Sequence, residues 1–299
     1  RLYREFQQAL KEKNLMGSTE ACAEACAEAY YRQLAQNPVL EPLHNNMRRN
    51  YAATLQDDAQ WILNLWLKGD MNLIPFTKKV QEDKFQVYPN YLARAAELLG
   101  EDHYMYTILQ ARKAYFEGYL MHIDHRVKDR ELGERILAKY RESLRWQPES
   151  PHVYYQMAAV HFFQMAQPDS AEHYAHLAMK LAPAWVIPYS YLGWMYTEYT
   201  ASHDLDKARY FLELADQVDT SSTNEFNLFN WAHYYAHAGE LEKAEEQWKE
   251  IIRLDSSSHW AYANLGNVYL IQGKFEPAIE AFRRSIALDA TNRISQNNL

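Results

Sequence analysis

Residues 259–292 read HWAYANLGNVYLIQGKFEPAIEAFRRSIALDATN, and the order of residue types in this segment decides the fold class. Gly266 and Tyr269 lie in its first half, Phe282 lies in its second half, and Gly273 stands between them. A glycine ends a helix easily because it accepts the left-handed backbone conformation. A second glycine facing an aromatic ring lets two helices approach closely. The segment therefore predicts a hairpin of two packed helices.

The same order of residue types recurs three times before this segment. Each unit is marked by a dipeptide, at Ala158-Ala159, Leu192-Gly193, Trp231-Ala232 and Leu265-Gly266, with successive spacings of 34, 39 and 34 residues. An aromatic residue follows three positions later, at Phe162, Tyr196, Tyr235 and Tyr269. A helix pair of this kind has an apolar face that only the next pair can bury. Four units in register therefore predict a stacked array.

This pattern resembles the tetratricopeptide repeat (TPR), and the resemblance covers roughly 180 residues. Four clear units span residues 152–292, and a degenerate unit precedes them. The resemblance implies an all-α fold, an α-solenoid of stacked antiparallel helix pairs (a TPR superhelix) with additional N-terminal helices. We divide the chain into an N-terminal helical region, residues 1–116, and a TPR array, residues 117–299.

Three units depart from the regular pattern. The unit at 186–224 is five residues longer than its neighbours, which predicts a longer turn within residues 198–206. The degenerate unit, residues 117–150, has Asp124 where the small contact residue should stand. Another unit begins at Arg293 and stops inside its first helix, as a terminal cap or because the sequence is part of a longer protein. The first residue, an arginine and not a methionine, favours the second alternative.

The region before the array reads as helices without a 34-residue register. They are expected at 2–14, from Ser18 or Thr19 to 36, at 41–67, at 90–99, and from Glu101 or Asp102 onward, with a loop and one short helix within 71–89. Diverged helical hairpins and a separate helical cap both fit, and we favour hairpins. Cys22 and Cys26 lie four apart in the second of these helices and are interpreted as small core residues. Two cysteines are too few for a disulfide framework.

Composition excludes several classes of function. The 299 residues carry a net charge of −8, and no cluster of Lys and Arg stands out to neutralise phosphates, so no nucleic-acid partner is expected. No apolar run is long enough to span a membrane. No glycine-rich phosphate loop or nucleophile elbow is present, so we expect no cofactor and no catalysis. The compartment stays open, with the cytoplasm slightly favoured.

Three histidine pairs are candidates for metal chemistry. His233 and His237 lie four apart on an expected helix, which is metal-ligand spacing, but the sequence offers no obvious third ligand. We therefore expect these two to line a groove and expect no metal. Two further pairs, His122 with His125 and His173 with His176, are expected on solvated helix faces.

The resemblance also implies where a partner binds, because the first helix of each TPR unit lines a concave groove. The expected groove residues are Phe163, Trp194, Phe226, Phe229, Asn230, His233, His237, Trp260, Asn264 and Asn267. They include no Lys or Arg, unlike the TPR class that clamps a carboxylate. Asn230, Asn264 and Asn298 resemble an asparagine ladder that bonds to a peptide backbone. As an alternative, Trp194, Phe226 and Trp260 pack between neighbouring units.

The sequence thus predicts a protein–protein interaction scaffold that binds a peptide or protein segment in the concave groove. The alternative is a regulatory or substrate-recruiting TPR segment of a larger multidomain enzyme, such as a peptidase, kinase or transferase, whose catalytic domain lies outside these residues. A third hypothesis, that this chain is itself an enzyme, requires a pocket of converging polar groups near His233 and His237. The partner and the oligomeric state are left open.

Overall fold

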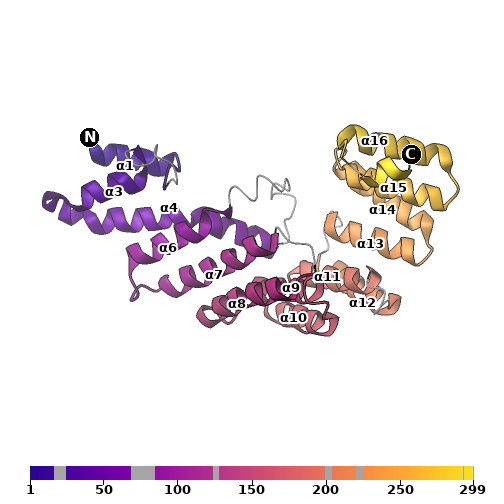
Figure 1. Cartoon of the computed structure of the whole chain (residues 1–299), viewed down its shortest axis with the longest axis horizontal. Coiled ribbons are helices and arrows are strands. Elements are labelled where there is room, and N and C mark those ends of the chain that lie inside the picture. The colour runs from indigo at the N-terminus through magenta and orange to yellow at the C-terminus, as the bar shows by residue number, and fades with distance from the viewer. Residues whose placement is uncertain are drawn as a thin grey trace. The chain divides into compact units, whose positions relative to one another are not determined.

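The computed structural model describes residues 1–16, 25–68, 85–123, 128–198, 204–219, 225–291 and 293–298. These residues form helices joined by turns and contain no strand, which confirms the all-α fold class (Figure 1). None of the helices in this part of the chain is both long and apolar enough to cross a membrane. The chain divides into two compact units, residues 1–67 with 73–171, and residues 172–299 with 68–72.

The helices before the array match the sequence pattern closely in two cases. The N-terminal part of the chain contains α1 (Leu2–Lys11), α3 (Ala27–Ala35), a short 3-10 helix (Pro38–Leu40), α4 (Glu41–Lys68), α6 (Tyr88–Leu99) and α7 (Tyr106–Ile123). Helix α4 begins at the predicted residue and ends one residue beyond the predicted end. Helix α6 ends at Leu99 as predicted, with Gly100 as its C-cap. The predicted loop at 71–89 falls largely on residues 69–84, outside the described residues.

Cys26 corrects the prediction for the second helix. It is the N-cap of α3, with φ −127° and ψ 170°, so an uninterrupted helix through this position to Gln36 is wrong. Its side chain is buried and disulfide-bonded, so it is not the plain core thiol that the sequence suggested. The predicted helix start at Ser18 or Thr19, and Cys22, lie outside the described residues.

The array consists of helix pairs at the predicted positions. Its helices are α8 (Arg130–Trp146), α9 (Pro151–Phe163), α10 (Pro168–Leu181), α11 (Val186–Glu198), α12 (Leu205–Val218), α13 (Glu225–His237), α14 (Leu241–Leu254), α15 (His259–Ile271), α16 (Phe275–Leu288) and α17 (Arg293–Asn298). The odd-numbered helices from α9 to α15 are the first helices of the four units. Helix α17 begins at the residue where the period places another unit.

The last full unit shows how glycine sets the pair geometry. A Cβ atom on Gly266 would lie 2.6 Å from Cε1 of Phe282, so only glycine allows this approach of α15 to α16. Gly273 ends α15 with φ +75°, and Gly239 has φ +77° in the turn between α13 and α14. The turn after α11 is longer, because α12 begins only at Leu205, where the Asp204 side chain accepts a hydrogen bond from Lys207 N at 3.0 Å. The predicted longer turn is therefore confirmed by the helix ends.

The degenerate unit has a different register from the predicted one. Its small contact residue is Gly118, where a Cβ atom would lie 2.8 Å from Tyr140 Cε1. Ser143 Oγ donates to the Ala111 carbonyl at 2.7 Å, just as Ser285 Oγ donates to a carbonyl at the start of α15 at 2.7 Å. The predicted contact residue, Asp124, lies outside the described residues, and Gly118 takes its role. Gly118 and Tyr140 are 22 residues apart, against 16 for the equivalent residues of the last unit, so an insertion of six residues concealed the register.

Candidate functional site

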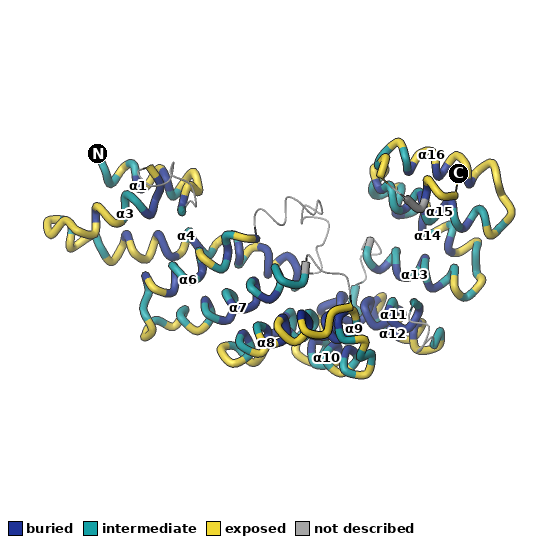
Figure 2. Tube along the Cα trace, in the orientation of Figure 1, coloured by how far each residue is buried: buried dark blue, intermediate teal, exposed yellow. Residues whose placement is uncertain are grey.

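Helix α11 is almost entirely buried, which singles out the two side chains that are not. Of its 13 residues, all except Trp194 and Glu198 are buried (Figure 2). These two are four residues apart and therefore lie on the same face of the helix. Trp194 was predicted in the groove; its ring centroid lies 6.2 Å from that of Tyr191 on the same helix.

Polar side chains join α11 to α13 near the start of both helices. Asn230 is fully buried, and its Nδ2 donates to the Ser190 carbonyl at 3.0 Å. Ser190 Oγ donates to Asn227 Oδ1 at 3.1 Å, and Asn227 Nδ2 donates to Asp216 Oδ1 at 2.5 Å. Burial raises the pKa of Asp216, although hydrogen bonds from Trp231 and Asn227 oppose this shift. The first helices of these two consecutive units are thus bonded directly to each other.

The predicted asparagine ladder has other partners in the structure. Asn230 holds the preceding unit and has no exposed surface to offer a ligand. Asn264 Nδ2 donates to the carbonyl of Trp260 in its own helix at 3.0 Å. Asn298 Nδ2 donates to Asn267 Oδ1 at 2.7 Å. Asn264 and Asn267 remain partly exposed, so they stay candidates for binding, whereas Asn230 has a packing role.

An aromatic cluster continues the contact from α13 to α15. The Phe229 ring lies 5.6 Å from Trp248 and 5.5 Å from Trp260, both edge-on, and 4.4 Å from the His233 ring, centroid to centroid. Trp248 is buried, while Phe229 and Trp260 are only partly buried. Trp260 therefore packs between units, as the alternative interpretation predicted, and still leaves part of its ring accessible. Phe226 is also partly buried, and Phe163, on α9 in the other compact unit, is exposed.

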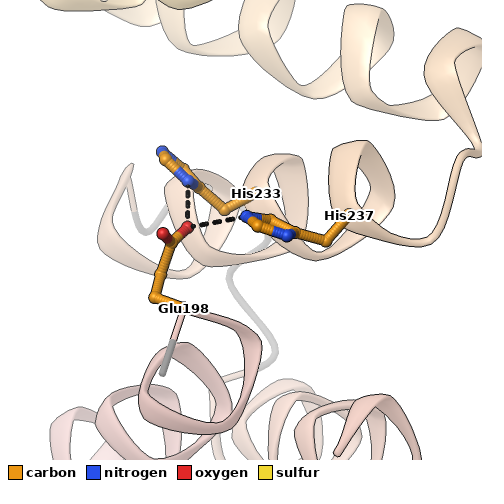
Figure 3. Close-up of side chains that lie close together, drawn as sticks. All are labelled: Glu198, His233 and His237. Carbon is orange, nitrogen blue, oxygen red and sulfur yellow. Dashed lines mark hydrogen bonds and ion pairs between the residues drawn. The ribbon is translucent and has the colours of Figure 1, made fainter. Parts of the chain in front are cut away.

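Two histidines and a glutamate meet at the other end of α11 and α13. His233 Nδ1 lies 2.5 Å from Glu198 Oε1, and His237 Nε2 lies 3.4 Å from the same oxygen (Figure 3). The hydrogen bond from His233 lowers the pKa of Glu198, although burial opposes the shift. Sequence reasoning paired the histidines but missed Glu198 as their partner. The only available signal was the position of Glu198 at the end of the first helix of its unit, since the resemblance places the first helices along the groove.

The remaining histidine predictions have mixed outcomes. His173 and His176 are exposed on α10, as predicted, and His176 Nε2 lies 3.6 Å from Glu172 Oε1. His122, however, does not lie on a solvated face. It is partly buried on α7, and burial lowers its pKa to about 4. His125 lies outside the described residues.

Comparisons with known proteins agree with this architecture. The tetratricopeptide repeat family matches residues 259–292. A chain of the APC/C hetero-tetramer Cut9–Hcn1 is similar over 98% of this chain and 55% of its own length, with 14% identity and a TM-score of 0.56. Residues 259–292 are a tetratricopeptide repeat. The thermophilic TPR protein TTC0263 of Thermus thermophilus matches 62% of this chain and 95% of its own, with 16% identity and a TM-score of 0.52.

A further TPR structure has a weaker likeness to this chain. YrrB, a TPR protein with an unusual peptide-binding site, is 18% identical, with a TM-score of 0.45, over 69% of this chain and 96% of its own length. A search of curated proteins found no significant match. The likenesses to the Cut9–Hcn1 chain and to TTC0263 show the fold alone, so the function has to be argued from the residues.

Proposed function

We propose that this TPR chain is an interaction scaffold, which binds an extended, mostly apolar segment of another protein along α11, α13 and α15, and that it acts by binding and not by catalysis. One observation carries the proposal. These three first helices contain no Lys or Arg, whereas the second helices of the same units, α12, α14 and α16, all carry basic residues. The Lys and Arg side chains of these units thus lie on the second helices and not on the first.

The side chains that these three helices leave accessible suit protein recognition. Trp194, Phe226 and Trp260 are partly exposed, and Ile271 is 67% exposed at the end of α15. Interfaces are enriched in large aromatic residues and depleted of Lys and Glu at their centre. Partly exposed rings held by their neighbours lose little conformational freedom on binding, which favours affinity. Asn264 and Asn267 supply amide groups beside these rings for a peptide backbone.

The contacts between units support one continuous surface. Asn230 and Ser190 join α11 to α13, and Phe229 and Trp260 join α13 to α15. An extended segment can therefore contact several units in turn. The fold likeness to a chain of the Cut9–Hcn1 hetero-tetramer, a protein assembly, adds support at the level of the fold.

The experiment begins with peptides selected from a random phage-displayed library on the purified chain. A selected peptide is labelled, and its affinity is measured by fluorescence anisotropy at low and high salt. We expect Trp194→Ala to weaken binding by ~2 kcal/mol and Asn264→Ala by less, because buried aromatic anchors dominate affinity. Salt should change the affinity little, because the three helices carry no Lys or Arg. Unchanged affinity in both variants, or binding abolished by salt alone, would contradict the proposal.

A further inference from the structure

Three metal-ligating side chains from two units converge in the compact unit of residues 172–299. His233 and His237 stand one turn apart on α13, and Glu198 is the last residue of α11. One ligand atom from each residue lies within 4.8 Å of the others, and Figure 3 shows the three side chains turned toward one another. The arrangement is built by the packing of consecutive first helices, not by one helix alone.

One of the two measured separations between ligand atoms matches what a tetrahedral ion requires, and the other is shorter. With zinc–nitrogen and zinc–oxygen distances of ~2.0–2.1 Å, two ligand atoms lie about 3.3 Å apart. His237 Nε2 already lies 3.4 Å from Glu198 Oε1. His233 Nδ1 lies 2.5 Å from that oxygen, so an entering ion has to widen this separation by roughly 0.8 Å. Small rotations of the Glu198 side chain supply such a movement without displacing either helix.

The surroundings hold the ligands in place and leave an entry path. The His233 ring packs against Phe229 at 4.4 Å and lies 5.3 Å from the Trp248 ring, which orients Nδ1 toward Glu198. The His237 side chain is 41% exposed, so an ion can reach the group from solvent. Helices α11 and α13 contain no Lys or Arg, so neither helix carries a side chain of these types that would repel a cation.

We propose that Glu198, His233 and His237 bind one divalent transition-metal ion, with zinc as the ion that best fits the donor set, and that the ion links α11 to α13. Two imidazoles and one carboxylate suit zinc and its neighbours in the first transition row, whereas magnesium and calcium prefer six or more oxygen ligands. Three protein ligands leave a fourth position for water or for a group from a partner. The site does not depend on the proposed peptide binding.

The test titrates zinc into the whole chain after the metal has been removed with a chelator. Calorimetry should show one saturable ion per chain, and cobalt should give the absorption bands of a four-coordinate site. Glu198→Gln and His237→Ala should each weaken zinc binding by at least ~100-fold, because losing a side chain that merely orients a ligand already costs about 10–100-fold. Zinc should also raise the melting temperature of the parent chain but not of His237→Ala.

His176→Ala is the matched control, because it also removes a histidine that contacts a glutamate, here Glu172. It should bind zinc like the parent. Circular dichroism without metal checks that each variant is folded, and the exposed position of His237 makes its variant the safest comparison. Absence of saturable zinc binding in the parent overturns the proposal, as does parent-like affinity in both Glu198→Gln and His237→Ala. In either case the three residues form a hydrogen-bonded contact between units and no metal site.

Discussion

Gly266 and Phe282 face each other across α15 and α16 at a separation that leaves no room for a side chain. A Cβ atom on the glycine would lie 2.6–2.9 Å from three atoms of the phenyl ring, and Phe282 is fully buried. The ring cannot move away without opening the core of the unit. The close approach of α15 to α16 therefore depends on the absence of a side chain at Gly266.

The first prediction concerns this contact. Gly266→Leu should lower the free energy of unfolding by more than roughly 2 kcal/mol, because overpacking forces the helices apart. The exposed Glu280→Leu on α16 is the control and should change stability little. Thermal melts of both variants and the parent decide it, and a midpoint unchanged by Gly266→Leu would show that the repeat register is wrong.

The second prediction tests the corrected register of the degenerate unit. Ser143 and Ser285 each donate a hydrogen bond to a backbone carbonyl of the preceding helix, both are buried, and each bond measures 2.7 Å. Ser143→Ala and Ser285→Ala should each cost ~1 kcal/mol in unfolding free energy, because a buried carbonyl loses its donor. Ser256→Ala, at an exposed position, should be neutral. If Ser285→Ala lowered the unfolding free energy and Ser143→Ala did not, the proposed equivalence of these two serines, and with it the corrected register, would be contradicted.

The third prediction concerns acid stability. Burial lowers the pKa of His152 to about 3 from 6.5, with a smaller contribution from Arg112, and the His152 ring packs edge-on against Tyr115. Well above its unfolded pKa the histidine is neutral in both states, so it adds no pH dependence there. As the pH falls from 6.5 toward 3, the unfolded chain binds a proton that the folded chain does not, so stability is lost across this window.

His152→Leu should therefore reduce the stability that is lost on acidification. At about pH 5 we expect the difference from the parent to be roughly 1 to 2 kcal/mol, measured by urea unfolding at about pH 5 and about pH 7.5. His173→Leu removes a surface histidine from α10 and serves as the control. Equal losses in the parent and in His152→Leu would contradict the assignment.

The sequence predicts those parts of the fold that depend on local chemistry. The 34-residue repeat pattern predicts that Gly266 lies opposite Phe282 and that Gly273 ends α15. Both roles require a glycine, and a glycine can be recognised in the sequence without knowing the structure. The start and end of α4 and the end of α6 at Gly100 follow from local signals of the same kind. Register fails only where an insertion separates the two helices of a pair, as between Gly118 and Tyr140.

The candidate site is harder to predict, because it depends on which side of one first helix faces the next. Asn230 has the residue type of a ligand-binding amide, yet it is buried against Ser190. Glu198 and His233 are 35 residues apart, and the pattern of a single unit does not show that they meet. Contacts between units arise from packing, which a repeat alignment does not contain.

The most direct test of the central claim, that partners bind along the first helices, compares two isoleucines of the last full unit. Ile271 on α15 and Ile279 on α16 are both exposed, at 67% and 40%, and they belong to the first and second helix. Affinity for a selected peptide is measured with Ile271→Ser and with Ile279→Ser. The account predicts that Ile271→Ser weakens binding by ~1 kcal/mol, roughly fivefold, and that Ile279→Ser leaves it unchanged. Weaker binding for Ile279→Ser with parent-like binding for Ile271→Ser would contradict it.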